Sequence, residues 1–257
     1  MLTIFIVFMV IALCAGLYMY CMARRWTGLG KPGNSTEYDV ENVETLADSP
    51  LTGKKVIFLG SSVTLGMASH GTSFVEYMEK RDQIVVVAKE AVSGTTLVNS
   101  GKNSYIERMK NNLDKSAEVD LFICQLSTND ASQKNPLGEV SSSKDKADFD
   151  TSTITGAIEY IIAYAKEIWN CDIVFYTGSR YADEAYDAMV DNLLKVQEKW
   201  DIGVINMWNN DTFNNIDSKA RQLYMNDNIH PLKAGYLKWW TPYIEEYLYA
   251  YYRNGVF

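Results

Sequence analysis

Two segments far apart in the chain hold the residue types of a nucleophile and of its general base. Residues 58–66 read FLGSSVTLG, so Ser62 follows an apolar run and a glycine. Residues 225–231 read MNDNIHP and place Asp227 three residues before His230. A serine hydroxyl becomes a nucleophile when a histidine accepts its proton, and a carboxylate orients that histidine. The spacing predicts Ser62 as nucleophile, His230 as base and Asp227 as the acid.

Two further segments carry groups that can donate hydrogen bonds to an oxyanion. Residues 91–96 read AVSGTT, and the backbone N–H of Gly94 can approach a ligand oxygen closely. Residues 125–130 read QLSTND, and the side-chain amide of Asn129 can donate in the same way. Each motif alone fits a helix cap or a turn, Ser62 included. Their joint occurrence favours a catalytic interpretation.

The search for the general base has two candidates, because the chain contains two histidines. His230 has Asp227 at short range in the sequence. His70 lies in a polar Ser-His-Gly stretch, where a surface or pocket-wall position is expected. His230 is therefore the predicted base.

Short apolar runs rich in β-branched residues predict five buried strands. They lie at residues 56–59, 84–88, 121–126, 173–176 and 203–207. Apolar residues recur at helical spacing in residues 154–169, 185–200 and 237–251. Strands buried on both faces and separated by helices predict a doubly wound, three-layer α/β/α sandwich with a five-stranded parallel sheet. Such a sheet binds ligands beyond the carboxyl ends of its strands, which the four segments follow.

The N-terminus is apolar. The first charged side chain is Arg24, so residues 2–22 are uncharged, and as a helix they would extend about 30 Å, the thickness of a bilayer core. No Lys or Arg precedes the stretch, and the bulky Leu13 stands before Cys14, which disfavours a cleaved signal. The pattern predicts one transmembrane helix that attaches the protein to a membrane.

This N-terminus sets the predicted domain organisation. The chain divides into a transmembrane anchor at residues 1–23, a juxtamembrane linker at residues 24–53 and a catalytic domain at residues 54–257. Arg24, Arg25 and Lys31 follow the span, so the positive-inside rule favours a cytoplasmic domain.

Composition argues against several partners. The formal charge is −8, and no basic run with interleaved aromatic residues is present, so nucleic acid is not an expected partner. The four cysteines lack the close pairing of a zinc site, and no cofactor or metal is expected.

The four polar segments, in this order, resemble the four blocks of the SGNH hydrolase superfamily, also called GDSL esterases and lipases. The resemblance covers roughly residues 54–250. The residues that match the family's functional positions are Ser62, Gly94, Asn129, Asp227 and His230. It implies a triad of Ser62, Asp227 and His230, and an oxyanion hole formed by the Ser62 N–H, the Gly94 N–H and the Asn129 amide.

Two residues depart from the family pattern. Ser61 stands where the Gly-Asp-Ser form has aspartate, and Ser127 stands where the Gly-x-Asn-Asp form has glycine. Neither change removes a catalytic group, but Ser127 puts the shape of the pocket in question.

The resemblance implies a serine esterase, and short acyl groups such as O-acetyl on a carbohydrate are the expected substrate. Acyl transfer, lysophospholipase or lipase activity on the same triad, and a catalytically silent binding module stay open as alternatives. Many relatives with apolar N-termini act outside the cell, which opposes the cytoplasmic prediction. The polar insert at residues 131–149 is either a wall of the site or a solvated loop.

Overall fold

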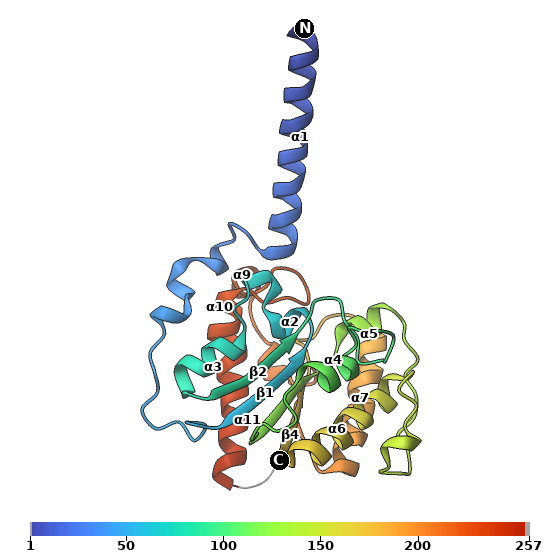
Figure 1. Cartoon of the computed structure of the whole chain (residues 1–257). Coiled ribbons are helices and arrows are strands. Elements are labelled where there is room, and N and C mark those ends of the chain that lie inside the picture. Colours follow the sequence, from blue (N-terminus) through green and yellow to red (C-terminus); the bar gives the residue numbers. More distant parts are fainter. Residues whose placement is uncertain (1, 255–257) are drawn as a thin grey trace.

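The computed structural model describes residues 2–254 and contains one sheet of five parallel strands (Figure 1). Its strand order is β2-β1-β3-β4-β5. The strands are β1 (Lys55–Gly60), β2 (Val85–Ala91), β3 (Leu121–Gln125), β4 (Asp172–Tyr176) and β5 (Gly203–Ile205). All five predicted strands are present, and the parallel sheet is confirmed.

Helices cover both faces of the sheet because its strands are apolar on both sides. In β1, Ile57 and Leu59 belong to one buried core, whereas Val56 and Phe58 belong to the other. The first core is covered by α4 (Tyr105–Asn112), α6 (Ile154–Trp169) and α7 (Glu184–Trp200). The second is covered by α3 (Phe74–Asp82), the π-helical turn η6 (Tyr236–Trp240) and α11 (Thr241–Asn254). The fold is the predicted three-layer sandwich.

The strand order brings the predicted site residues to one place. The chain runs from β1 outward to β2 and then returns to β3 on the other side of β1. The crevice of a parallel sheet lies where the order reverses in this way, beyond the carboxyl ends of the strands. Segments that follow β1, β2 and β3 therefore meet at the same edge.

Short helices occupy the connections at this edge. They are α2 (Ser62–Leu65), η4 (Met67–Ser69), α5 (Thr128–Ser132), α8 (Asp211–Asn214), α9 (Ser218–Tyr224) and α10 (Lys233–Gly235). Sequence periodicity predicted neither these nor α3 and α4. The start of α3 has a local signal, a capping box in which Ser73 and Glu76 bond each other's backbone N–H.

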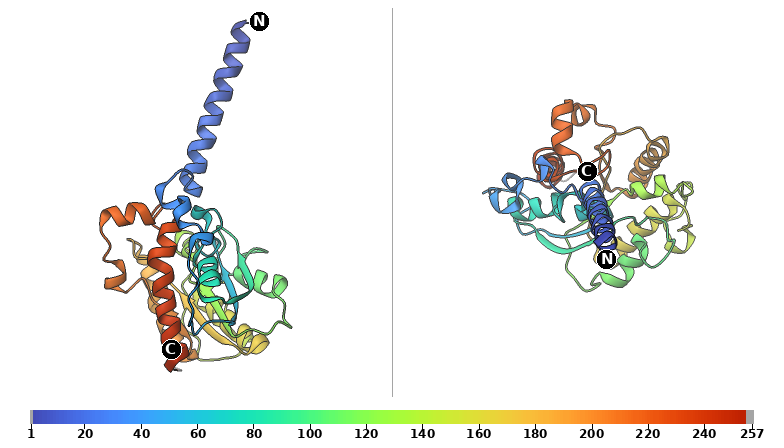
Figure 2. Two further views of the ribbon diagram at one scale, coloured as in Figure 1. Left: turned by 90° about the vertical axis from the view of Figure 1, so that its left-hand side faces the viewer. Right: turned by 90° about the horizontal axis from the view of Figure 1, so that it is seen from above.

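The apolar N-terminus forms a helix, α1 (Leu2–Thr27). Figure 1 shows α1 projecting from the end of the domain where α2, α9 and α10 lie, and the left view of Figure 2 shows it standing clear of the domain. Within the described residues, no helix combines the length and the apolar character that crossing a membrane requires. The transmembrane span predicted at residues 2–22 is therefore not supported, and the cellular location stays a prediction.

The segment between α1 and β1, predicted as a linker, lies against the domain. It contains three 3₁₀ turns, η1 (Pro32–Asn34), η2 (Thr36–Tyr38) and η3 (Val40–Asn42). The carbonyl of Tyr38 accepts a hydrogen bond from the Tyr77 hydroxyl at 2.6 Å, and the Leu51 side chain is buried. These contacts join the segment to α3 and to the second core.

The polar insert at residues 131–149 packs on α6 and α7. The buried Glu159 accepts a hydrogen bond from the Ser141 N–H at 2.8 Å and from the Trp200 indole at 3.0 Å, and it pairs with Lys199. A buried carboxylate is stable only with such partners. Gln133, near the start of the insert, lines a cavity that is described below.

Candidate active site

Ser62 lies at the turn that follows β1. The strand ends at Gly60, Ser61 is the N-cap of α2, and Ser62 is its first residue. A Cβ atom at Gly60 would lie 1.7 Å from Oγ1 of Thr64, so only glycine permits so tight a turn. At the first position of a helix the Ser62 N–H has no intrahelical acceptor, which leaves it available to a ligand.

His230 and Asp227 lie in a short loop that folds back on itself. The Asn226 N–H donates to the His230 carbonyl at 2.8 Å, and Met225 forms an isolated bridge with Pro231. One carboxylate oxygen of Asp227 accepts from the N–H groups of Ile229 at 2.8 Å and of His230 at 2.9 Å. The backbone of the loop thus holds the Asp227 carboxylate in place next to His230.

The structure joins the three predicted triad side chains in series. The Ser62 Oγ lies 2.8 Å from His230 Nε2, and His230 Nδ1 lies 2.9 Å from the Asp227 Oδ2. Ser62 is 5% exposed, so the residue lies almost completely buried. A proton can pass from Ser62 to Nε2 while Asp227 holds the other ring nitrogen, as nucleophilic catalysis requires.

Asp227 is ionised in this arrangement. Partial burial opposes its ionisation, but the hydrogen bond and charge of His230, together with the backbone N–H groups of Ile229 and His230, lower the pKa of Asp227 to about 2. At neutral pH the carboxylate is therefore charged and can stabilise an imidazolium.

A hydrogen bond connects Asn129 to the segment that carries Gly94. Gly94 has φ +78°, in the left-handed region that glycine tolerates best. The Asn129 amide donates to the carbonyl of Thr95, the residue after Gly94, at 2.9 Å. A side-chain amide has two hydrogens, so one stays free for an oxyanion. Among the described residues, the Gly94 N–H has no acceptor.

Gln125 holds the turn that carries Ser62, a role that the sequence did not reveal. This buried side chain lies at the end of β3, and its Oε1 accepts from the Ser61 N–H at 2.9 Å and from the Thr64 hydroxyl at 2.9 Å. Thr64 also bonds the Tyr176 hydroxyl at the end of β4, at 2.6 Å. The turn is thereby fixed to two neighbouring strands.

Arg108 and Asp130 hold the segment that carries Gly94. Both side chains are buried. Arg108 donates to the Gly60 carbonyl at 2.8 Å and to the Thr95 hydroxyl at 3.1 Å, so it connects the end of β1 to this segment. Asp130 accepts from the Leu97 N–H at 2.8 Å, and burial raises the pKa of Asp130 despite its hydrogen bonds. Sequence gave no signal for these long-range contacts.

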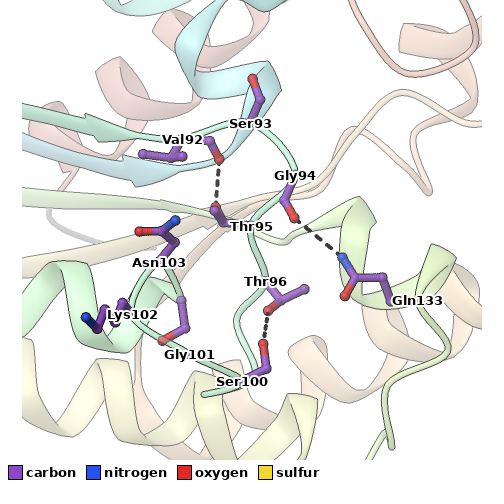
Figure 3. A pocket seen from close by; sticks show the side chains of 11 residues that line it. Val92, Ser93, Gly94, Thr95, Thr96, Ser100, Gly101, Lys102, Asn103 and Gln133 are labelled. Atoms are coloured by element: carbon purple, nitrogen blue, oxygen red, sulfur yellow. Dashed lines mark hydrogen bonds between the residues drawn. The ribbon is translucent and has the colours of Figure 1, made fainter.

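A polar cavity of about 340 Å³ lies beside Gly94 (Figure 3). Its two walls are residues 92–96 and 100–104, and Gln133 closes one side. Figure 3 shows the Gln133 amide reaching the Gly94 carbonyl, and Thr96 bonded to Ser100 between the walls. All lining residues except Val92 are polar or glycine, and such a lining suits a hydroxylated group better than an alkyl chain.

His70, the other candidate for the general base, does not take part in this site. His70 is exposed, whereas His230 contacts Ser62. In the part of the chain that the structure describes, no group of three or more His, Cys, Asp or Glu side chains could hold a metal ion.

The three-layer fold and the contacts between serine, histidine and aspartate place this chain among α/β proteins with a site like that of serine hydrolases. A model described as the GDSL-like Lipase/Acylhydrolase family matches residues 58–238, more than half of the chain. The chain belongs to this family, and the resemblance seen in the sequence is confirmed. No protein of curated function matches the chain in sequence.

Solved structures share the fold at low identity. A protein described as a GDSL-like lipase from Bacteroides ovatus is 16% identical with a TM-score of 0.59, over 77% of this chain and 98% of that one. A family two carbohydrate esterase from Clostridium thermocellum, solved in complex with cellohexaose, is 16% identical with a TM-score of 0.55, over 83% of this chain and 66% of that one. At this identity the likeness establishes the fold.

The lowered pKa of Asp227 predicts a pH-dependent contribution to stability. Its ordinary pKa of 3.8 applies to the unfolded chain, whereas the folded value is about 2. The stabilisation is therefore complete above the unfolded pKa and is lost as the pH falls through the folded one. The difference in free energy of unfolding between the wild type and Asp227→Asn, measured by urea denaturation, should shrink as the pH is lowered from about 5 to about 2. A difference that stays constant over this range would contradict the ionised pairing.

Proposed function

We propose that this protein is a serine esterase that removes short acyl groups, such as acetyl, from a carbohydrate. The observation that carries the proposal is the unbroken series from the Ser62 hydroxyl through His230 to Asp227. Membership of a family of lipases and acylhydrolases supports ester hydrolysis as the reaction.

The proposed reaction proceeds in two stages. His230 Nε2 takes the Ser62 proton as Oγ attacks the ester carbonyl, and then gives that proton to the leaving alcohol. The Ser62 N–H, the Gly94 N–H and the free Asn129 amide hydrogen bind the oxyanion, each contributing about 3 kcal/mol to transition-state stabilisation. Water, deprotonated by His230, then attacks the acyl-enzyme, and His230 returns the proton to the Ser62 Oγ as the acid is released.

The preference for a carbohydrate ester draws support from the cavity beside Gly94. A wall of hydroxyl and amide groups matches a sugar, and a lipase would need an apolar surface for its acyl chain. A structural neighbour is a carbohydrate esterase, which agrees with this class of substrate. Acyl transfer would use the same triad with a sugar hydroxyl in place of water, and the proposal takes water as the acceptor.

The nucleophile is tested by replacing each of the two adjacent serines. Ser62→Ala should lower kcat for p-nitrophenyl acetate by about a thousandfold or more, because triad members act as a unit. Ser61→Ala is the matched control, since the buried Ser61 hydroxyl bonds Gln125 rather than His230, and the backbone N–H that Gln125 also holds is retained. A wild type without turnover, or an active Ser62→Ala protein, would overturn the proposal and favour a silent binding module.

Acyl chain length tests the substrate class. The polar cavity predicts that kcat/KM falls at least about tenfold from p-nitrophenyl acetate to p-nitrophenyl octanoate, because an alkyl chain leaves polar groups unpaired. Acetylated oligosaccharides should also be hydrolysed. Rates that rise with chain length would instead identify a lipase or lysophospholipase.

A further inference from the structure

The chain between α1 and β1 passes through a narrow gap beside the site. Gly28 has φ +66°, and a Cβ atom there would lie 2.4 Å from the Ala68 carbonyl oxygen. A Cβ atom at Gly33 would lie 2.0 Å from the Leu223 carbonyl oxygen. Residues 28–34 are therefore inserted between the turn after the nucleophile and the segment that carries the base.

One side chain in this gap bonds both neighbours. Asn34 Nδ2 donates to the Ala68 carbonyl at 2.8 Å, and Asn34 Oδ1 accepts from the Lys233 N–H at 3.0 Å. Ala68 lies in η4, directly after the helix that begins with Ser62. Lys233 begins α10, three residues after His230. The Asn34 side chain thus connects the two halves of the triad.

A second contact from the same segment reaches the acid. Lys31 Nζ donates to the Asn226 carbonyl at 2.6 Å, directly before Asp227. Lys233 in turn pairs with Asp39, which fixes the far side of the segment to α10. The loop from 225 to 231 is therefore held by the N-terminal segment as well as by its own bonds.

We propose that Asn34 is a positioning residue that sets the separation between Ser62 and His230. This rests on the proposed esterase function, because the separation matters only if the serine gives its proton to the histidine. A single 2.8 Å contact is sensitive to small displacements of either side. The family match begins at residue 58, so Asn34 lies outside the part of the chain that it covers. The contacts of Asn34 thus come from a segment outside the matched domain.

The experiment compares full-length Asn34→Ala with Asn42→Ala. Asn42 is the matched control, since among residues 2–254 its side-chain amide bonds only the Thr36 carbonyl, which lies in the same segment. For Asn34→Ala we expect kcat for p-nitrophenyl acetate to fall about 10- to 100-fold with KM within about twofold. Hydrogen exchange should accelerate about tenfold or more in peptides spanning 224–233, whereas peptides from β3 should be unchanged. Asn42→Ala should match the wild type in both measurements.

Lys31→Met provides a second variant in case Asn34→Ala does not fold. It removes the bond to the Asn226 carbonyl and keeps an apolar stem, and it should change kcat and local exchange in the same direction. Exchange and kcat equal to those of Asn42→Ala would overturn the proposal, as would faster exchange throughout the sheet. A wild type without esterase activity would refute the proposed function. Hydrogen exchange would still decide whether Asn34 holds the loop from 225 to 231.

Discussion

The arrangement of the candidate site depends on one hydrogen bond, between the Ser62 hydroxyl and the His230 imidazole. This bond joins residues 168 positions apart. The two groups must approach to 2.8 Å although no local structure connects them. Gln125, at the end of β3, and Arg108, on α4, fix the serine side through the Ser61 N–H and the Gly60 carbonyl. The histidine side is a loop whose own carboxylate, Asp227, accepts its backbone N–H groups. The sheet thus supplies a rigid support, and the last loop brings the base to it.

Both departures from the family pattern have a place in this arrangement. Ser127, which stands where a glycine is usual, caps α5 and donates to the Thr95 carbonyl at 3.1 Å. The Asn129 amide bonds the same carbonyl, so the extra side chain adds a second contact between the segment of Gly94 and the segment of Asn129. Ser61, in the position of an aspartate, is fully buried against Gln125. A buried hydroxyl satisfied by an amide costs less than a buried carboxylate would.

Sequence reasoning predicted what depends on local pattern and chemical type. The apolar strand runs and the order of the polar segments were sufficient for the sheet. The structure brings Ser62, His230 and Asp227 together, and their catalytic roles stay a prediction. Gln125 and Arg108 were missed because their partners lie far away in the chain and no spacing reports them. The contacts of residues 28–34 were missed for the same reason, since a stretch rich in glycine and polar residues looks like a linker until its packing is known. The apolar run at residues 2–22 does form helix, but the membrane span inferred from it is not supported.

Covalent labelling can test whether Ser62 is a nucleophile that His230 activates, as proposed. The full-length protein would be treated with an alkyl fluorophosphonate, which phosphonylates activated serines, and the adduct would be located by peptide mass spectrometry. We predict a single adduct on Ser62 that His230→Ala abolishes. No adduct on Ser62, or one that forms equally in His230→Ala, would contradict the claim.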